Sequence, residues 1–505
     1  GCDAVTKLKK LVSVGEANVP DDEKYAVHVD VSEKDKTIKI SDNGIGMTAD
    51  EIKKYINQIA FSGASDFMAK YSEKTSDEND IIGHFGLGFY SAFMVADKVE
   101  IDTLSYQEGA ESAKWISDGG IEFEITDGDR TERGTTITLF IGEDGKEFLD
   151  YALMYKTLRK YCSFMPVEIF FNYEHEKTEE EIKEEEETKK AAQEKSEDNS
   201  SSENSAENVE DKKEEPLPIN DTTPLWLKNP KDITDDEYKA FYHKVFTDMS
   251  DPLFWIHLNM DYPFNLKGIL YFPKLLSDVD VLEGEIKLFS NQVYIADNVK
   301  EIVPEFLLLL KGVMDCPDLP LNVSRSALQN DGYAQKMSLY ISKKVGDKLN
   351  SIFKNDRQSY EKFWDDISLF IKYGCMKEEK FYDKVKPSLI YKTTNGVYKT
   401  LDEYLEDNKD KHENKVFYVS DENQQVQYVN MLKEQNMEAL ILSSRIDVNF
   451  ISFLEYKSQG KPQFARVDAD IAETLKDSEA QNDDKLSEEM QNLFRGTLSN
   501  NDLTV

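Results

Sequence analysis

The segment 174–215 limits what this chain can fold into more than any other stretch of its sequence. It holds 18 acidic and 7 basic residues, and Glu, Lys, Ser and Asn dominate it. Because it has few aliphatic side chains and no apolar face, burial cannot offset the entropy that ordering it would cost. We therefore expect an acidic, disordered linker with globular parts of the chain on either side.

Residues 1–173 are expected to form one α/β domain. Alternating apolar and polar residues predict strands at Tyr25–Val31, Lys36–Ile40, Val99–Asp102 and Thr135–Phe140. Thr48 followed by Glu51 is the spacing of a capping box and predicts the start of a helix. A mixed sheet with helices on one face is the simplest architecture. The small and charged residues from Ser62 to Asp80 are a candidate mobile segment.

Residues 216–471 are expected to form a second α/β part, the middle domain. Strands are predicted at 255–261 and 268–273, long amphipathic helices at 336–373, and a renewed βα pattern at 415–419 and 439–442. The acidic stretch 472–505, with a helix near 488–494, is expected to begin a further domain.

The charge balance argues against several classes of partner. With 61 basic and 98 acidic residues the net charge is −37, and such a surface repels nucleic acid and anionic membranes. No apolar run approaches the length of about 20 residues that crosses a bilayer.

The cysteines and histidines predict no metal site. Four cysteines lie far apart without Cys-x-x-Cys spacing, which favours a reducing compartment, and six histidines show no ligand spacing.

A first glycine signature, Asp42-Asn43-Gly44-Ile45-Gly46-Met47, follows a predicted strand. Asn-Gly between strands is also the strongest short signal for a hairpin turn. Here the signature leads into the capped helix, so we expect Asp42 at a strand end beside a pocket, where its carboxylate could accept from a purine amino group.

A second signature, Gly83-His84-Phe85-Gly86-Leu87-Gly88-Phe89, differs from both the dinucleotide and the Walker spacings. It could be a surface loop. Three glycines running into an apolar helix are better explained as backbone N–H groups bared for phosphates at a helix N-terminus. Thr135, after Gly134, either starts a strand or reaches the base with its hydroxyl.

Arg325 follows the Pro-anchored segment Asp318-Leu-Pro-Leu-Asn-Val-Ser. From its residues alone it is a surface salt-bridge residue or a rigidly held guanidinium suited to a γ-phosphate.

Taken together, these motifs resemble the heat shock protein 90 family of molecular chaperones, most nearly its bacterial branch. The likeness includes Arg133-Gly-Thr and Leu-Pro-Leu-Asn-Val-Ser-Arg and covers nearly the whole chain apart from the linker. It implies an N-terminal two-layer α/β sandwich of the Bergerat (GHKL) type, shared with gyrase, MutL proteins and histidine kinases, which binds ATP in a kinked conformation. The middle domain is implied to be α/β with a helical connector.

The resemblance also implies roles for individual residues. Asp42 would accept the adenine amino group, with Gly46, Met47 and Thr135 around the base, and Asp3 would line the pocket. The phosphates would be held by the second signature: Gly83, His84, Phe85, Gly86, Leu87, Gly88 and Phe89. Arg325, assisted by Gln329, would reach the γ-phosphate and serve hydrolysis.

Two departures from the family pattern affect these roles. The general-base Glu and the Mg²⁺-binding Asn of the family precede the position of Gly1, where this chain opens as if within a helix. We expect the chain to be truncated at both ends, to bind ATP weakly and to hydrolyse it very poorly as written. Tyr55 and Phe61 stand where relatives carry Asn and Lys.

The sequence thus predicts a cytoplasmic, ATP-dependent chaperone with ATP and Mg²⁺ as cofactors. Client proteins, possible cochaperones and a homodimer of the full-length protein are the implied partners. The alternatives are a DNA-acting ATPase of gyrase or MutL type, a histidine kinase, or a scaffold that holds clients without hydrolysis.

Overall fold

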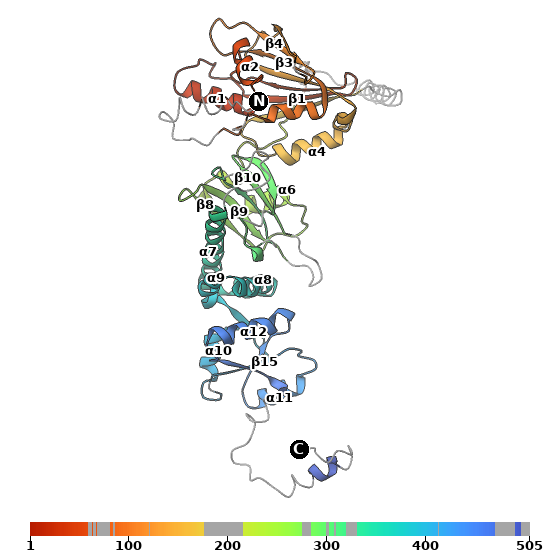
Figure 1. Ribbon diagram of the computed structural model, residues 1–505. Helices are drawn as coiled ribbons and strands as arrows, with labels where there is room; N and C mark the ends of the chain where they lie inside the picture. Colours follow the sequence, from red (N-terminus) through yellow and green to blue (C-terminus); the bar gives the residue numbers. More distant parts are fainter. Residues whose placement is uncertain are drawn as a thin grey trace, which may run out of the picture. The chain divides into compact units, whose positions relative to one another are not determined.

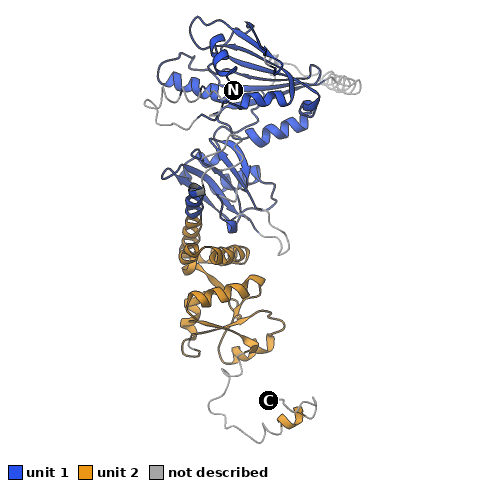
Figure 2. Cartoon of the chain, in the orientation of Figure 1, with its two compact units in different colours: residues 1–341 blue, residues 342–505 orange. Residues whose placement is uncertain are grey.

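The computed structural model describes residues 1–58, 63, 67, 81–83, 86–120, 122–175, 216–274, 284–298, 302–307, 310–319, 331–412, 414–469 and 490–495 (Figure 1). The chain divides into two compact units, Gly1–Ile341 and Ser342–Val505 (Figure 2). Nearly all of the expected linker 174–215, and most of the stretch from Ser62 to Asp80, lie outside the described residues.

A mixed sheet organises the first part of the first unit. Its order among the described residues is β5-β4-β3-β6-β2-β1-β7, and neighbours are antiparallel except β1 and β7. The four strands predicted from alternation are confirmed as β1, β2, β3 and β6. The bounds are β1 Ala26–Ser32, β2 Thr37–Asp42, β3 Ala96–Leu104, β4 Ala113–Ser117, β5 Glu124–Asp127, β6 Gly134–Ile141 and β7 Glu168–Glu174.

Helices cover one face of this sheet and share its core. Val5 of α1, Ile52 of α2 and Met154 of α4 belong to one buried cluster with sheet residues such as Val29 and Val99, so the domain has two layers. The helices are α1 Cys2–Ser13, α2 Ala49–Tyr55, η1 Gly88–Met94, η2 Glu143–Leu149 and α4 Tyr151–Cys162, of which η1 and η2 are 3₁₀.

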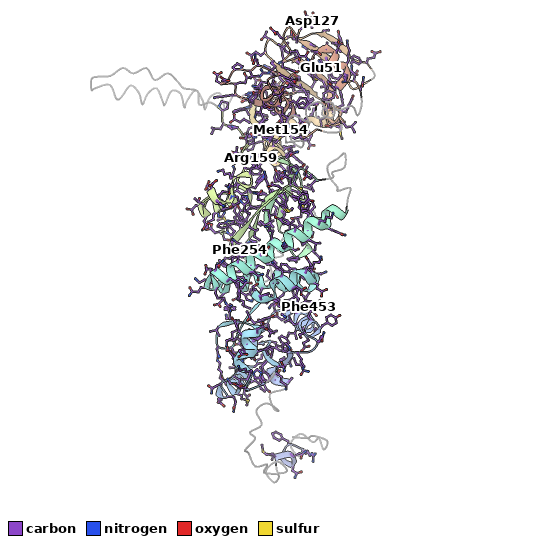
Figure 3. The ribbon with its side chains drawn as sticks, turned by 90° about the vertical axis from the view of Figure 1, so that its left-hand side faces the viewer. Glu51, Asp127, Met154, Arg159, Phe254 and Phe453 are labelled. Atoms are coloured by element: carbon purple, nitrogen blue, oxygen red, sulfur yellow. The ribbon has the colours of Figure 1, made fainter. Side chains whose placement is uncertain are left out.

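The predicted capping box at the start of α2 is confirmed. The Thr48 N–H donates to Glu51 Oε2 at 2.8 Å, and the Glu51 N–H donates to Thr48 Oγ1 at 3.3 Å. Figure 3 shows Glu51 within this part of the molecule.

A second sheet, ordered β11-β10-β12-β9-β8, follows in the same unit. Helix α6, started by a Thr234–Glu237 capping box, packs on it through an aromatic core that includes Tyr242 and Tyr271. The elements are η3 Leu225–Leu227, η4 Pro230–Asp232, α6 Asp235–Val245, β8 Phe254–Met260, β9 Leu266–Phe272, β10 Glu285–Ser290, β11 Val293–Asp297, η5 Glu305–Leu307 and β12 Lys311–Asp315.

The two sheets of the first unit are joined by packing and hydrogen bonds. Phe164, which precedes β7, lies with its ring centroid 4.7 Å from that of Trp226 in the second core. The Ile219 N–H donates to the Ile169 carbonyl at 2.8 Å.

The second unit combines helices with a small parallel sheet, ordered β16-β15-β17. The helices expected near 336–373 are present as α7, which crosses the boundary between the units, and α8. Residues 490–495 are helical. The elements are α7 Asp331–Asn355, α8 Arg357–Lys377, α9 Glu379–Val385, η6 Lys386–Ser388, β13 Ile390–Lys392, β14 Tyr398–Thr400, α10 Leu401–Asn408, β15 Lys415–Val419, α11 Val426–Glu434, β16 Leu440–Ile441, α12 Arg445–Lys457 and β17 Gln463–Arg466.

None of the described helices combines the length and the apolar character that a membrane crossing requires.

Candidate nucleotide site

Asp42 is the last residue of β2, and its side chain is buried, with 7% of the residue exposed. Strand register places it between Val27 of β1 and Thr135 of β6. The Gly44 N–H donates to Asp42 Oδ1 at 2.9 Å, and Oδ2 lies 3.9 Å from the Gly1 amino nitrogen. The turn therefore orients the carboxylate through one oxygen only, and Oδ2 faces the start of α1.

The first glycine signature is a tight connection, and each of its glycines meets a neighbour. A Cβ on Gly44 would lie 2.5 Å from the Ala4 Cβ of α1. Gly46 has φ +60°, and a Cβ there would lie 1.9 Å from the Leu104 carbonyl oxygen. Since the next element is α2 and not a strand paired with β2, the hairpin interpretation is wrong.

Two arginines that the sequence did not single out for a role hold this connection from the segment between β5 and β6. Arg133 donates from Nε to the carbonyls of Asn43 at 3.2 Å and Gly44 at 3.1 Å, and from Nη2 to Glu23 at 2.6 Å. Arg130 Nη2 donates to the Asp42 carbonyl at 3.3 Å. The Arg-Gly-Thr motif contains one of these arginines, but its spacing does not reveal what the guanidinium binds.

Met47 and Thr135 meet at a buried hydroxyl, that of Thr103. Thr103 Oγ1 accepts the Met47 N–H at 3.0 Å and donates to the Gly134 carbonyl at 3.0 Å. Its 2.9 Å contact with Thr135 Oγ1 must then use the Thr135 proton, so Thr135 has only lone pairs left to offer a ligand. Thr103 was missed because a threonine in an alternating strand carries no signal of its own.

Asp3, in the first turn of α1, binds the start of the second glycine signature. Its Oδ1 accepts the Ile82 N–H at 2.8 Å, and its Oδ2 accepts the Gly83 N–H at 2.7 Å. Burial lowers the pKa of Lys7, one turn further along α1, while the Asp3 carboxylate opposes that shift. Asp3 thus ties α1 to the glycine-rich segment.

The rest of the second signature is described from Gly86 onward. Gly86 has φ +65°, and a Cβ on Gly88, the first residue of η1, would meet no heavy atom of the described residues within 4 Å. The Phe89 ring packs edge-on against Trp115 at 5.7 Å, so the ring belongs to the core and the backbone is the part of Phe89 left for a ligand. The expected helix after the glycines is 3₁₀.

Several predicted residues lie outside the described residues, namely His84, Phe85, Arg325, Gln329 and Phe61. Tyr55, at the end of α2, accepts from Lys54 Nζ at 3.4 Å through its hydroxyl.

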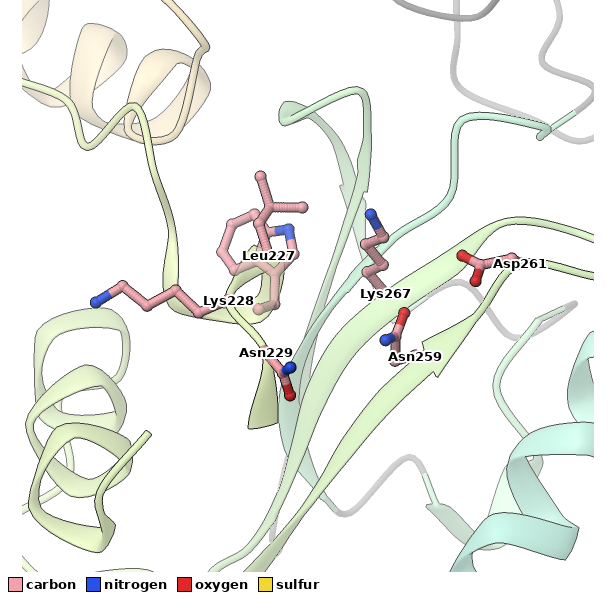
Figure 4. A pocket seen from close by; sticks show the side chains of 7 residues that line it. Leu227, Lys228, Asn229, Asn259, Asp261 and Lys267 are labelled. Atoms are coloured by element: carbon pink, nitrogen blue, oxygen red, sulfur yellow. The ribbon is translucent and has the colours of Figure 1, made fainter. Parts of the chain in front are cut away.

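A separate cavity of about 310 Å³ lies beside the second sheet (Figure 4), and none of the predicted site residues line it. Its walls are Trp226, Leu227, Lys228, Asn229, Asn259, Asp261 and Lys267. Across the described ranges, no group of three or more His, Cys, Asp or Glu side chains could hold a metal ion.

Two family models match parts of this chain. Residues 147–501 match the family model described as Hsp90 protein. Residues 20–125, which include Asp42 and the second signature, match the model described as histidine kinase-, DNA gyrase B-, and HSP90-like ATPase.

Curated relatives agree with these matches. The chain is 46% identical over 480 residues to the chaperone protein htpG of Bacteroides fragilis (strain YCH46), covering 94% of this chain and 65% of that protein. It is 45% identical to the chaperone protein HtpG of Bacteroides thetaiotaomicron and 42% identical to that of Porphyromonas gingivalis, covering 97% and 96% of this chain. In these last two cases it spans 67% of the relative's length.

Proposed function

The chain belongs to the Hsp90 protein family, and on that premise we propose that it is an ATP-dependent molecular chaperone of the bacterial HtpG type. The observation that carries the proposal is the buried Asp42 carboxylate, which the Gly44 N–H orients at the end of β2. A carboxylate has only acceptor atoms, so it suits the amino group of adenine. Gly46, Met47 and Thr135 would surround the base.

We propose that the second signature holds the phosphates through backbone N–H groups. No described residue fills the space where a Gly88 side chain would stand, which supports close approach of an anion. Arg325, with Gln329, would neutralise the γ-phosphate as its charge spreads during hydrolysis. Mg²⁺ would accompany ATP, and the resemblance puts its protein ligand, an Asn, ahead of Gly1.

Hydrolysis would time a conformational cycle that acts on partly folded client proteins. A protein made of residues 1–505 alone would hydrolyse ATP slowly, because the resemblance also puts the general-base Glu ahead of Gly1. The proposal also includes homodimerisation of the full-length protein, possible cochaperones and a cytoplasmic location. The four cysteines are all free, which fits a reducing compartment.

Titration calorimetry with Mg·ATP, on a version of the protein extended ahead of Gly1, tests the nucleotide site. Asp42→Asn exchanges one acceptor for an amide that presents a donor, and leaving a buried group mispaired costs about 1–3 kcal/mol, so we expect the affinity to fall by about tenfold or more. Asp127→Asn, an exposed carboxylate on the edge strand β5 (Figure 3), is the matched control and should bind as the parent does. Equal affinities for all three proteins would refute the role of Asp42.

Suppression of aggregation tests the chaperone activity and separates it from the alternatives. The chain should keep a heat-denatured model enzyme in solution, and ATP should change that effect in a version extended ahead of Gly1. A salt-dependent shift of duplex DNA would instead support a DNA-acting ATPase, which the net charge of −37 disfavours.

A further inference from the structure

A surface of four aromatic rings lies where α4 meets the edge strand β7. We name Tyr151, Tyr155, Phe171 and Tyr173 the tyrosine surface. Tyr151 and Tyr155, one helical turn apart, stack with centroids 5.8 Å apart and planes 8° apart. Tyr151 also lies 5.6 Å from Phe171 and 5.3 Å from Tyr173, so the four rings are contiguous.

Phe171 and Tyr173 pack against the edge of the domain core, whereas Tyr151 and Tyr155 do not belong to it. Helix α4 buries Met154, while Tyr151 and Tyr155 stay 49% and 38% exposed. Contiguous exposed apolar groups on a protein surface mark interaction sites more often than chance. The faces of exposed aromatic rings attract cations, Arg and Lys above all.

The charge around the tyrosine surface adds to this attraction. Glu33 Oε2 accepts from the Tyr173 hydroxyl at 3.3 Å. Partial burial raises the pKa of Tyr173, and the carboxylates of Glu33 and Asp150 raise it further because they oppose a second negative charge. Lys156 is the exposed cation of α4 nearest in sequence to Tyr155. Its single positive charge is small beside the net charge of −37 of the whole chain.

The backbone beside these rings can pair with a further strand. β7 is the last strand of the sheet, and the Ile169 N–H and carbonyl bind Asn220 and Ile219 on the side away from β1. Because backbone groups alternate along a strand, Phe171 and Tyr173 present theirs on that same side. Within the described part of the chain no backbone group pairs with them there.

We propose that the tyrosine surface binds an extended, lysine- or arginine-rich segment of a partner protein. The segment adds to β7 through its backbone, and its cations lie over the tyrosine rings near Glu33 and Asp150. The surface is distinct from the candidate nucleotide residues, so its test stands independently of the proposed function.

Fluorescence anisotropy with a labelled peptide of alternating Lys and Val tests the proposal, and the same peptide with Glu for Lys is the probe control. The double variant Tyr151→Ala, Tyr155→Ala should bind the Lys peptide about tenfold more weakly, as expected from losing two cation–ring contacts. Tyr151→Phe, Tyr155→Phe keeps the rings and should retain binding. Added salt should weaken binding to the parent.

Tyr161→Ala is the matched control, because Tyr161 is 47% exposed on the same helix but packs on Tyr294 outside the tyrosine surface. The proposal is overturned if the Glu peptide binds equally well, if Tyr161→Ala weakens binding as much as the double variant, or if the Phe variant loses binding. A dimer of the chain that only the Ala double variant disrupts would assign the surface to a second copy and also overturn it. Thermal unfolding midpoints of the variants check that each protein is folded.

Discussion

Asp3 and Gly83 are joined by a 2.7 Å hydrogen bond from the Gly83 N–H to the Asp3 carboxylate, although 80 residues separate them in the sequence. The neighbouring Ile82 N–H binds the other oxygen of the same carboxylate. A single side chain of α1 therefore fixes the entry to the glycine-rich segment, and the geometry of that segment depends on the helix.

We expect Asp3→Ala to loosen this entry. Two part-buried backbone N–H groups lose their acceptor. A fully buried unsatisfied donor costs about 1–3 kcal/mol, so the free energy of unfolding should fall by about 1 kcal/mol, the lower end of that range. Hydrogen exchange should accelerate at Ile82 and Gly83. Asp3→Asn keeps one acceptor oxygen and should show a smaller effect. Asp50→Ala, whose side chain is 94% exposed, is the control; equal exchange rates in all variants would contradict the prediction.

A pair of glycine substitutions separates backbone strain from steric collision. Gly46→Ala must accommodate φ +60° and a Cβ 1.9 Å from the Leu104 carbonyl oxygen, whereas Gly15→Ala has φ +75° with no atom of the described part of the chain within 4 Å. The left-handed conformation alone costs about 1–2 kcal/mol, so Gly15→Ala should lose that and Gly46→Ala clearly more. Urea unfolding measures the free energy of unfolding of both variants. Similar losses would show that the connection at Gly46 accommodates the added Cβ without further cost.

Asp315 should make the stability of the second sheet depend on pH. It is 4% exposed at the end of β12; its Oδ2 accepts from Trp226 Nε1 at 3.2 Å, while Oδ1 has no hydrogen-bond partner among the described residues. Burial raises the pKa of Asp315 from 3.8 to about 6. The hydrogen bonds that Oδ2 accepts from Trp226 Nε1 and from the Gln292 N–H lower the pKa and so oppose this shift. A carboxyl with a raised pKa binds more protons folded than unfolded, so its contribution to stability falls as pH rises from about 4 to about 6.

The variant Asp315→Asn removes this titration. Relative to the parent, it should gain about 1 kcal/mol of unfolding free energy between about pH 5 and about pH 7.5. Trp226 fluorescence during urea unfolding reports on the same core. Asp232→Asn, an exposed carboxylate, should track the parent at both pH values; a parallel pH dependence for Asp315→Asn would exclude Asp315 as the source.

Lys372 of α8 and Asp447 of α12 form a buried ion pair, and removing only one of its partners should strongly destabilise the second unit. Nζ and Oδ1 are 2.6 Å apart, with both side chains almost fully buried. Lys372→Met strands a buried carboxylate, at a cost of about 3–5 kcal/mol. Adding Asp447→Asn removes that charge and keeps an acceptor for the Ser444 N–H, so most of the loss should be recovered.

Fluorescence of the buried Trp364 on α8 follows this unfolding. Lys409→Met breaks the exposed pair with Glu406 and should cost less than about 1 kcal/mol. A double variant no more stable than Lys372→Met would show that charge burial is not the cause.

Local patterns allowed the strands and the α2 capping box to be predicted, because alternation and the Thr48–Glu51 spacing act over a few residues. They also placed Asp42 at a strand end next to a helix start. The contacts that shape the candidate site are tertiary: Asp3 with Gly83, Arg133 with Asn43, and Thr103 with Thr135. No spacing within one segment encodes which distant backbone group a side chain will meet, so these contacts appear only once the chain is folded.

The parallel pairing of β1 with β7 has a consequence for synthesis on the ribosome. Asp30 and Asn172 are hydrogen-bonded across this pair, 142 residues apart. At about 5–20 residues per second, the nascent chain must wait on the order of ten to thirty seconds before β7 emerges. During that interval the edge of β1 that later pairs with β7 has unpaired backbone N–H and C=O groups. The nascent domain is therefore itself exposed to aggregation.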